Sequence, residues 1–331
     1  MESTTRLDRP SRGARAHAQI ERMWQASPPL TAVSALMIAA ALAAAIGLLV
    51  DPRTITGAPA WLKPLKFAVS TTVYGLTLAW IFTYLPDWRR MRRIVGWTTA
   101  VVFVLEVGII DAQAWRGTTS HFNASAPLDQ VLFAIMGTAI VVQTLVSVAV
   151  VVAVWRHRFA DRSLGWALRF GTALTVVGAL TGGLMTRPTQ TQLAELRAGG
   201  HPAAIGAHTV GGPDGGPGLP LTGWSREHGD LRVPHFIGLH AIQALALVAL
   251  GLRRWRRPES TRVKAVLAAG ASYTALFAVL LWQAMHGRSL AASDAAALMP
   301  LGLWAASTLL AFGAIAVARP ARDDGPTEVA A

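Results

Sequence analysis

Long apolar runs, separated by short polar and basic segments, dominate the chain. Eight of these runs are long enough, or nearly so, to cross a hydrocarbon core about 30 Å thick. Because a backbone in lipid must satisfy its own hydrogen bonds, each run is predicted to be a helix. The runs cover residues 29–50, 67–86, 94–113, 129–155, 164–185, 234–252, 263–285 and 296–318. The pattern therefore predicts an all-α, polytopic membrane protein with eight transmembrane helices.

The basic residues lie mostly on one side of this arrangement. Alternate segments place 21 of the 30 Lys and Arg residues on the side that holds both termini, while the 18 acidic residues divide equally. That side therefore carries the whole net charge of +12, as the positive-inside rule expects of a cytoplasmic face. We predict a multi-pass protein of the plasma (inner) membrane with both termini in the cytoplasm. The lipid bilayer is its expected partner, and no nucleic acid is needed to explain the charge.

The two halves of the sequence resemble each other. Matched residues keep the same order and the same places relative to the apolar runs. They are Gly47, Leu48 and Pro52 with Gly183, Leu184 and Pro188 at an offset of 136, and Pro64, Gln113, Ala114 and Gly117 with Pro234, Gln283, Ala284 and Gly287 at an offset of 170. This pattern predicts a duplicated four-helix unit. An even number of helices gives both units the same orientation, as in parallel repeats.

The duplication predicts the organisation of the chain. The expected parts are a basic cytoplasmic tail (1–28), a first four-helix unit (29–158), a second four-helix unit (159–318) that contains an external loop (186–233), and a cytoplasmic tail (319–331). The change of offset places an insertion in the loop, whose segment GGPDGGPGLP is too rich in Gly and Pro to be helical. The loop is either a flexible connection or a lid over the outer face of the bundle.

Composition limits the chemistry that this protein can use. The chain contains no cysteine, which excludes disulfides, thiolate metal sites, iron–sulfur clusters and a covalently attached haem. Histidines, carboxylates and amides are therefore the groups that remain for a site.

Ionisable side chains inside the predicted spans concentrate in the outer halves of the helices. Such groups cost about 2.5–3.5 kcal/mol on insertion scales, so they usually form pairs or have a function. Glu106 and Asp111 in the third span, with His240 in the sixth, are the candidate catalytic residues for proton transfer. A structural role is the alternative, with Glu106 hydrogen-bonded to a neighbouring helix and His240 bridging two helices. Their shared location predicts one polar, His-rich site that opens outward.

Further residues near the same side supply candidates for binding. The basic and amide side chains that could hold a substrate are Lys63, Lys66, Arg116, Gln113, Gln243, Gln283 and Arg232. The candidate metal ligands are His121, His235, His240 and His286, because imidazole suits Zn, Cu and Fe. A haem b held between His240 and His286 is the second cofactor hypothesis. The sequence does not decide between a metal ion, haem b and neither.

Three classes of function fit this pattern. The first is a membrane enzyme or cofactor protein, which binds a metal or haem or modifies a lipid at the outward-facing site. The second is a transporter or channel for a small solute or ion, although the cytoplasmic halves of the spans carry few polar groups. The third is a membrane subunit that docks a partner protein or forms a homo-oligomer. The substrate is not determined.

Overall fold

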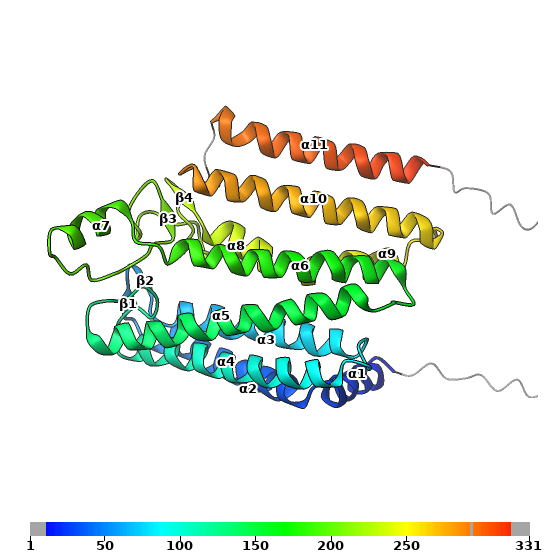
Figure 1. The fold of residues 1–331 in the computed structure, drawn as a ribbon, viewed down its shortest axis with the longest axis horizontal. Coiled ribbons are helices and arrows are strands. Elements are labelled where there is room, and N and C mark those ends of the chain that lie inside the picture. The colour runs from blue at the N-terminus through cyan, green and yellow to red at the C-terminus, as the bar shows by residue number, and fades with distance from the viewer. Residues whose placement is uncertain (1–10, 292–293, 319–331) are drawn as a thin grey trace, which may run out of the picture. The chain divides into compact units, whose positions relative to one another are not determined.

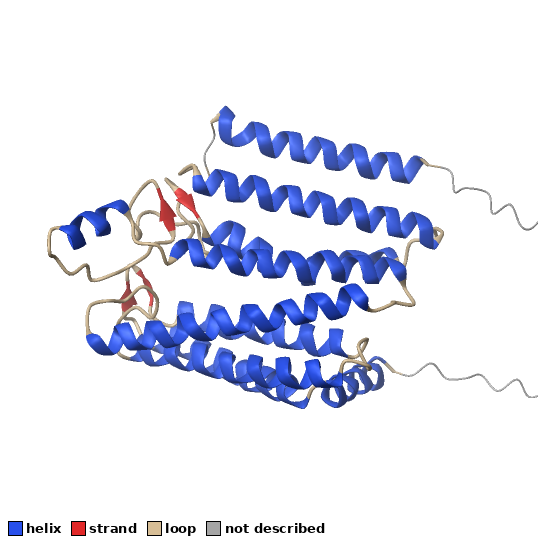
Figure 2. Ribbon diagram, in the orientation of Figure 1, coloured by secondary structure: helices blue, strands red, loops and turns tan. Residues whose placement is uncertain are grey.

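The computed structural model describes residues 11–291 and 294–318, and helices account for most of them (Figures 1 and 2). The helices are α1 (Arg12–Ala26), α2 (Pro28–Val50), α3 (Leu62–Phe82), α4 (Arg89–Trp115), α5 (Pro127–Arg156), α6 (Arg162–Met185), α7 (Gln190–Arg197), α8 (Arg232–Leu239), α9 (Ala241–Leu252), α10 (Glu259–Met285) and α11 (Ala295–Val317). The short strands form two antiparallel pairs. β1 (Thr54–Ile55) pairs with β2 (Ala58–Pro59), and β3 (Thr209–Val210) pairs with β4 (Gly229–Asp230).

The helices match the predicted class of protein. Within the described ranges, seven helices are long and apolar enough to cross a membrane, and the bent pair α8–α9 would be an eighth. The prediction of an all-α chain compatible with a multi-pass membrane protein is confirmed. The count of eight depends on the bent pair.

Most predicted spans differ from the helices by a few residues at their ends, and the second and sixth differ in ways that affect candidate site residues. The second span, expected at 67–86, is α3 and already begins at Leu62, because a helix continues through Lys63 and Lys66 near the membrane surface, where long charged side chains can extend to water. The sixth span, expected to be continuous over 234–252, bends by 45° at His240. The bend coincides with a hydrogen bond from Thr175 Oγ1 to the Leu239 carbonyl, which is typical of kinks caused by a side chain.

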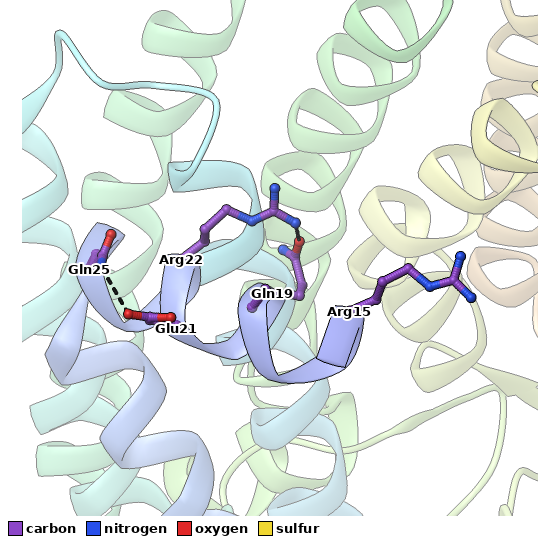
Figure 3. A pocket seen from close by; sticks show the side chains of 6 residues that line it. Arg15, Gln19, Glu21, Arg22 and Gln25 are labelled. Carbon is purple, nitrogen blue, oxygen red and sulfur yellow. Dashed lines mark hydrogen bonds between the residues drawn. The ribbon is translucent and has the colours of Figure 1, made fainter. Parts of the chain in front are cut away.

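The first described helix, α1, lies within the predicted basic tail and was not expected from the apolar pattern. Its polar side carries Arg15, Gln19, Glu21 and Arg22 around a shallow hollow (Figure 3). The side chain of Met23 is buried, and α1 packs against α2 and α3. An amphipathic helix of this kind suits a membrane surface.

The described chain divides into two compact units. The first contains the chain up to Ala153 together with Pro188–Gly206, and the second contains Val154–Arg187 together with the chain from Ala207. In the first unit, apolar side chains of α2, α3, α4 and α5 form a common core, which includes Val33, Ala68, Phe103 and Ala139.

A tight hairpin fixes the connection between α2 and α3 in the first unit. Thr56 and Gly57 both have positive φ, as the two-residue turn between β1 and β2 requires. The Trp61 indole then packs directly against Gly47, and its Nε1 donates a hydrogen bond of 2.8 Å to Asp51. These contacts hold the start of α3 beside the end of α2.

In the second unit, α6 is the central helix. It packs against α8, α9 and α10, and α11 packs on α10. The backbones of α6 and α8 touch where Gly178 meets Gly238, and no side chain would fit between them. Small residues allow such close crossings in membrane helices.

Parts of the segment 186–233 are held by hydrogen bonds within each unit. In the first unit, Ala124 N donates to Ala203 O and Ile205 N donates to Phe122 O. In the second unit, Ser289 Oγ donates to Ser225 O. The GGPDGGPGLP segment contains no helix, as predicted. These bonds argue against a fully flexible connection, and the lid stays a hypothesis.

Candidate functional site

Glu106 lies on the buried face of α4, with 3% of its surface exposed. Phe103 and Val107, on the same face, belong to the apolar core of the first unit, against which Phe67 of α3 packs. Among the described residues, Oε1 of Glu106 has no hydrogen-bond partner. Lys63 is near enough to interact with the carboxyl electrostatically. Because buried polar atoms are nearly always paired, an open carboxyl oxygen here indicates a place for a proton or a polar ligand.

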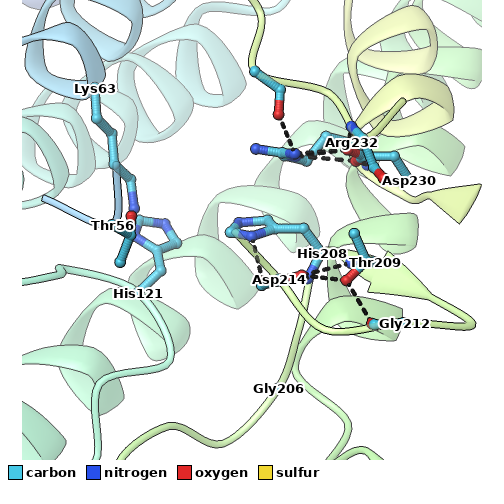
Figure 4. Close-up of polar contacts among 12 residues, drawn as sticks. Thr56, Lys63, His121, Gly206, His208, Thr209, Gly212, Asp214, Asp230 and Arg232 are labelled. Atoms are coloured by element: carbon cyan, nitrogen blue, oxygen red, sulfur yellow. Dashed lines mark hydrogen bonds and ion pairs between the residues drawn. The ribbon is translucent and has the colours of Figure 1, made fainter. Parts of the chain in front are cut away.

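Lys63 links this region to His121, which lies between α4 and α5. The side chains of Lys63 and His121 point toward each other (Figure 4), and Lys63 Nζ is 3.1 Å from Nδ1 of His121. Ser120 Oγ is 3.1 Å from the same nitrogen. An ammonium group can only donate, so Nδ1 accepts this bond and the neutral ring carries its proton on Nε2. The ring also contacts Phe67 and Phe133. Nδ1 accepts a hydrogen bond and Nε2 carries the ring proton. This state of the ring does not favour His121 as a metal ligand.

Gln113 and Arg116, two candidate substrate-binding residues, are bonded to an acidic residue that the sequence analysis did not single out. Gln113 Nε2 donates to Asp129 Oδ1 at 2.9 Å, and Arg116 Nη1 donates to the same oxygen at 2.7 Å. Gln113 and Asp129 are both buried. Their bonds connect the end of α4 to the first turn of α5, which is a structural use of both side chains.

A second polar group lies between α3 and α5 in the same unit. Tyr74 Oη and Ser147 Oγ are 3.3 Å apart, and Gln143 Nε2 donates to Ser147 Oγ at 3.3 Å. The Oε1 atom of Gln143 is buried and has no hydrogen-bond partner within the described chain. The Tyr74 ring packs against Phe103, one turn before Glu106.

The two remaining first-unit candidates differ in burial. Asp111 is half-buried on α4, and the Lys66 side chain is exposed on α3. Their predicted roles in catalysis and substrate binding stay predictions.

In the second unit, His235 acts as a bridge between helices. Its Nδ1 lies 2.8 Å from the Gly178 carbonyl of α6 and 3.2 Å from Thr181 Oγ1. A carbonyl can only accept, so Nδ1 carries the proton and Nε2 keeps a lone pair. Hydrogen bonds from a ring nitrogen to a carbonyl also orient metal-bound histidines, so this bond alone does not exclude a ligand role for His235.

His240 and His286, which were predicted as a possible pair of haem b ligands, lie in different environments of this unit. His240 lies at the bend between α8 and α9 and forms a hydrogen bond with the Gln243 side chain. Its ring is tilted against that of Phe236, with the ring centres 4.3 Å apart. His286 is exposed at the end of α10, with Nδ1 2.8 Å from the Trp282 carbonyl. The two rings are not joined by a contact in the described structure.

The other second-unit candidates have structural partners. Gln283 is buried, and its Nε2 donates to the Ala297 carbonyl of α11. Arg232 forms a two-pronged ion pair with Asp230, and its Nη2 also donates to the Gly223 carbonyl. These bonds connect neighbouring elements of the second unit, which is a structural use of both side chains.

A clustered metal site is not found in the part of the chain that the structure describes. No three or more His, Asp or Glu side chains there come together in a group that could hold a metal ion. Convergence of Glu106 with His240 stays a prediction, because the two residues belong to different units.

Comparisons with protein-family models, with curated proteins and with solved structures find no match to this chain. The site must therefore be interpreted from its own geometry.

The acidic residues that organise the loops were missed by the sequence analysis. Asp51 pairs with Arg53, and Asp230 pairs with Arg232, with the same bonds from the arginine backbone N, Nε and Nη2. Hydrogen bonds from the Arg53 side chain, and to a smaller extent from Trp61, hold the pKa of the Asp51 carboxyl well below its ordinary value. The signal in the sequence was the spacing Asp-x-Arg beside a helix end.

Asp214 plays a similar part in the loop before β4. Its carboxylate accepts hydrogen bonds from the backbone N of His208 and of Thr209 and lies 2.8 Å from His208 Nδ1 (Figure 4). Partial burial alone would raise the pKa of Asp214, but the bonds and charge of His208, with the Thr209 bonds, hold it well below its ordinary value.

This pKa predicts that the loop loosens in acid. The stabilisation by Asp214 is complete above the unfolded-state pKa of about 3.9 and is lost as pH falls through the lower folded-state value. Protection of the His208 and Thr209 amides from hydrogen exchange should therefore decline at low pH, after correction for intrinsic rates. In Asp214→Asn the protection should be weaker and nearly independent of pH in the acid range. Equal acid sensitivity in that variant would contradict the assignment.

Proposed function

We propose that the chain crosses the membrane eight times as two parallel four-helix units that arose by duplication, with both termini in the cytoplasm. The ends of α4 and α10 support the repeat. Thr118 N bonds to Gln113 O and Arg288 N bonds to Gln283 O, both at 3.0 Å, and each turn contains a glycine with positive φ. Both glutamines are buried, and each donates to the start of the next helix.

We further propose that the protein is a membrane enzyme whose acid–base group is Glu106. The observation that carries this proposal is the buried carboxyl oxygen without a hydrogen-bond partner among the described residues. A carboxyl in that position can give a proton to a bound molecule or take one from it. Lys63, bonded to His121, supplies a cation near enough to interact with the carboxyl electrostatically. An anionic amphiphile that enters from the outer side is the substrate class that this pair would suit.

The positions of Glu106 and Lys63 along their helices support a site in the outer half of the membrane. Glu106 lies nine residues, or about 14 Å, from the end of α4 at Trp115, and Lys63 is in the first turn of α3. The pair Lys63–His121 would lie at the mouth of the site and Glu106 at its base.

A transporter is the second candidate, and the Tyr74, Ser147 and Gln143 group favours it. Tyr74 lies about 17 Å along α3 from Lys63, so these polar side chains extend the series toward mid-membrane. A proton or small solute that passed Glu106 would meet them next. Haem b binding and docking of a partner are weaker hypotheses, because no observation beyond the positions of His240 and His286 supports the first.

The carboxyl chemistry of Glu106 can be tested without a known substrate. A hydrophobic carbodiimide reacts with membrane carboxyls that carry a proton, and mass spectrometry locates the adduct. We expect labelling at Glu106 in native membranes, protection by an anionic detergent-like amphiphile, and loss of that protection in Lys63→Gln. Glu106→Gln should remove the adduct and change the free energy of unfolding by no more than about 1 kcal/mol.

Proteoliposomes with an internal pH indicator separate the two candidates. Proton flux that is present in the wild type and absent in Glu106→Gln would favour the transporter, and labelling without flux would favour the enzyme. Glu195→Gln, in α7, is the matched control and should change neither result. An unreactive Glu106 together with severe misfolding of Glu106→Gln would instead assign this residue a structural role.

A further inference from the structure

A cavity of about 300 Å³ lies at the start of α6 in the second unit and has no part in the site described above. Three arginines and two aromatic residues line it. They are Arg158, Phe159, Arg162, Trp166 and Arg169. The size is at the lower end of pockets that bind small molecules.

Arg169 is held in place by the cavity wall. Its Nη2 donates to the His157 carbonyl at 2.9 Å, and its guanidinium lies 5.1 Å from the Trp166 ring centre and 5.8 Å from that of Phe159. A guanidinium fixed by stacking loses little freedom when it binds an anion.

Arg158 and Arg162 are exposed at the opening and have no carboxylate within ion-pair distance in the described part of the chain. The nearby acids are already used. Asp161 pairs with Arg253 at 2.8 Å, and Glu259 accepts a bond from the backbone N of Arg162. The cavity therefore has an excess of positive charge that an anion would balance.

The position of the cavity suits a lipid headgroup. Arg162 is the first residue of a helix long enough to cross a membrane, and Trp166 follows one turn later. Trp166 packs edge-to-face against Trp155, and tryptophans of this kind mark the membrane–water interface.

We propose that this cavity binds the phosphate group of an anionic phospholipid, on the side of the membrane where most basic residues of the sequence lie. The guanidiniums of Arg158 and Arg162 contact the phosphate oxygens, and Arg169 forms the back of the site. Basic pockets between membrane helices recognise lipid phosphates in this way.

The test compares lipid binding to the full-length protein by native mass spectrometry. The wild type should retain phosphatidylglycerol in preference to phosphatidylcholine. The double variant Arg158→Gln/Arg162→Gln should lose about tenfold in affinity for phosphatidylglycerol. Arg254→Gln/Arg256→Gln removes the same charge from exposed positions outside the cavity and should change the affinity less than about twofold.

Two results would overturn the proposal. Equal losses in both double variants would mean that general charge attracts the lipid and that the cavity has no specific role. Binding of inorganic phosphate as tight as that of phosphatidylglycerol, with full displacement of the lipid, would identify a soluble phosphate as the ligand. Unchanged thermal unfolding of both variants serves as the folding control.

Discussion

Replacing Gly178 with alanine is expected to lower the free energy of unfolding by about 2–3 kcal/mol, because the new methyl group would overlap the backbone of α8. A Cβ atom at this position would lie 2.5 Å from the carbonyl carbon of Gly238 and 2.6 Å from its Cα. Backbone atoms cannot rotate away as a flexible side chain can, so α6 and α8 must separate. Loss of helical circular dichroism during titration with a denaturing detergent measures the effect.

Gly183 provides the matched control on the same helix. A Cβ there would meet nothing within 4 Å, and its φ is not positive. Gly183→Ala should therefore be neutral or stabilising by up to about 1 kcal/mol, the difference in helix propensity between the two residues. Equal stability of the two alanine variants would mean that α6 and α8 do not cross closely at Gly178.

Replacing Asp129 with alanine is expected to destabilise the first unit by about 2 kcal/mol. This carboxylate is buried and accepts bonds from Gln113, Arg116 and Ser125. Its removal leaves the buried Gln113 amide with only its longer bond to the Thr119 carbonyl, and it removes the ion-pair partner of the exposed Arg116. Detergent-induced unfolding measures the loss.

Two variants serve as controls for this prediction. Asp129→Asn keeps an acceptor oxygen and should lose less than the alanine variant. Asp87→Ala removes an exposed carboxylate and should change stability by less than about 0.5 kcal/mol. If Asp129→Ala were as stable as the wild type, Gln113 and Arg116 would not depend on Asp129, and their predicted role in substrate binding would gain support.

The apolar pattern predicted helices well because length and hydropathy are the properties that lipid selects. It was less accurate at the ends. Charged residues near the start of α3 hid its true beginning, so the predicted span was displaced toward the end of the helix. The helix α1 was missed because an amphipathic surface helix has no long apolar run. The bend at His240 coincides with a contact from another helix, at Thr175, which no local pattern contains.

Of the candidate site, the sequence supplied the residues, and their role in a site stays a prediction. Sequence identified Glu106 as a polar residue inside a span, and the structure buries it with an open oxygen among the described residues. The partners of Gln113 and Arg116 were not foreseen, because Asp129 lies at the start of a different helix. The Tyr74–Ser147 contact was missed for the same reason.

The class of protein, the approximate spans and the uneven distribution of charge can be read from the sequence alone, since each depends on residues that are neighbours in the chain. Which polar side chains are already paired, and which keep an open atom, follows from the packing of the helices. That distinction depends on how each helix is rotated and where it crosses its neighbour, as at Gly178 and Gly238. A rotation of one residue, about 100°, would turn Glu106 away from the core while leaving its place in the sequence unchanged.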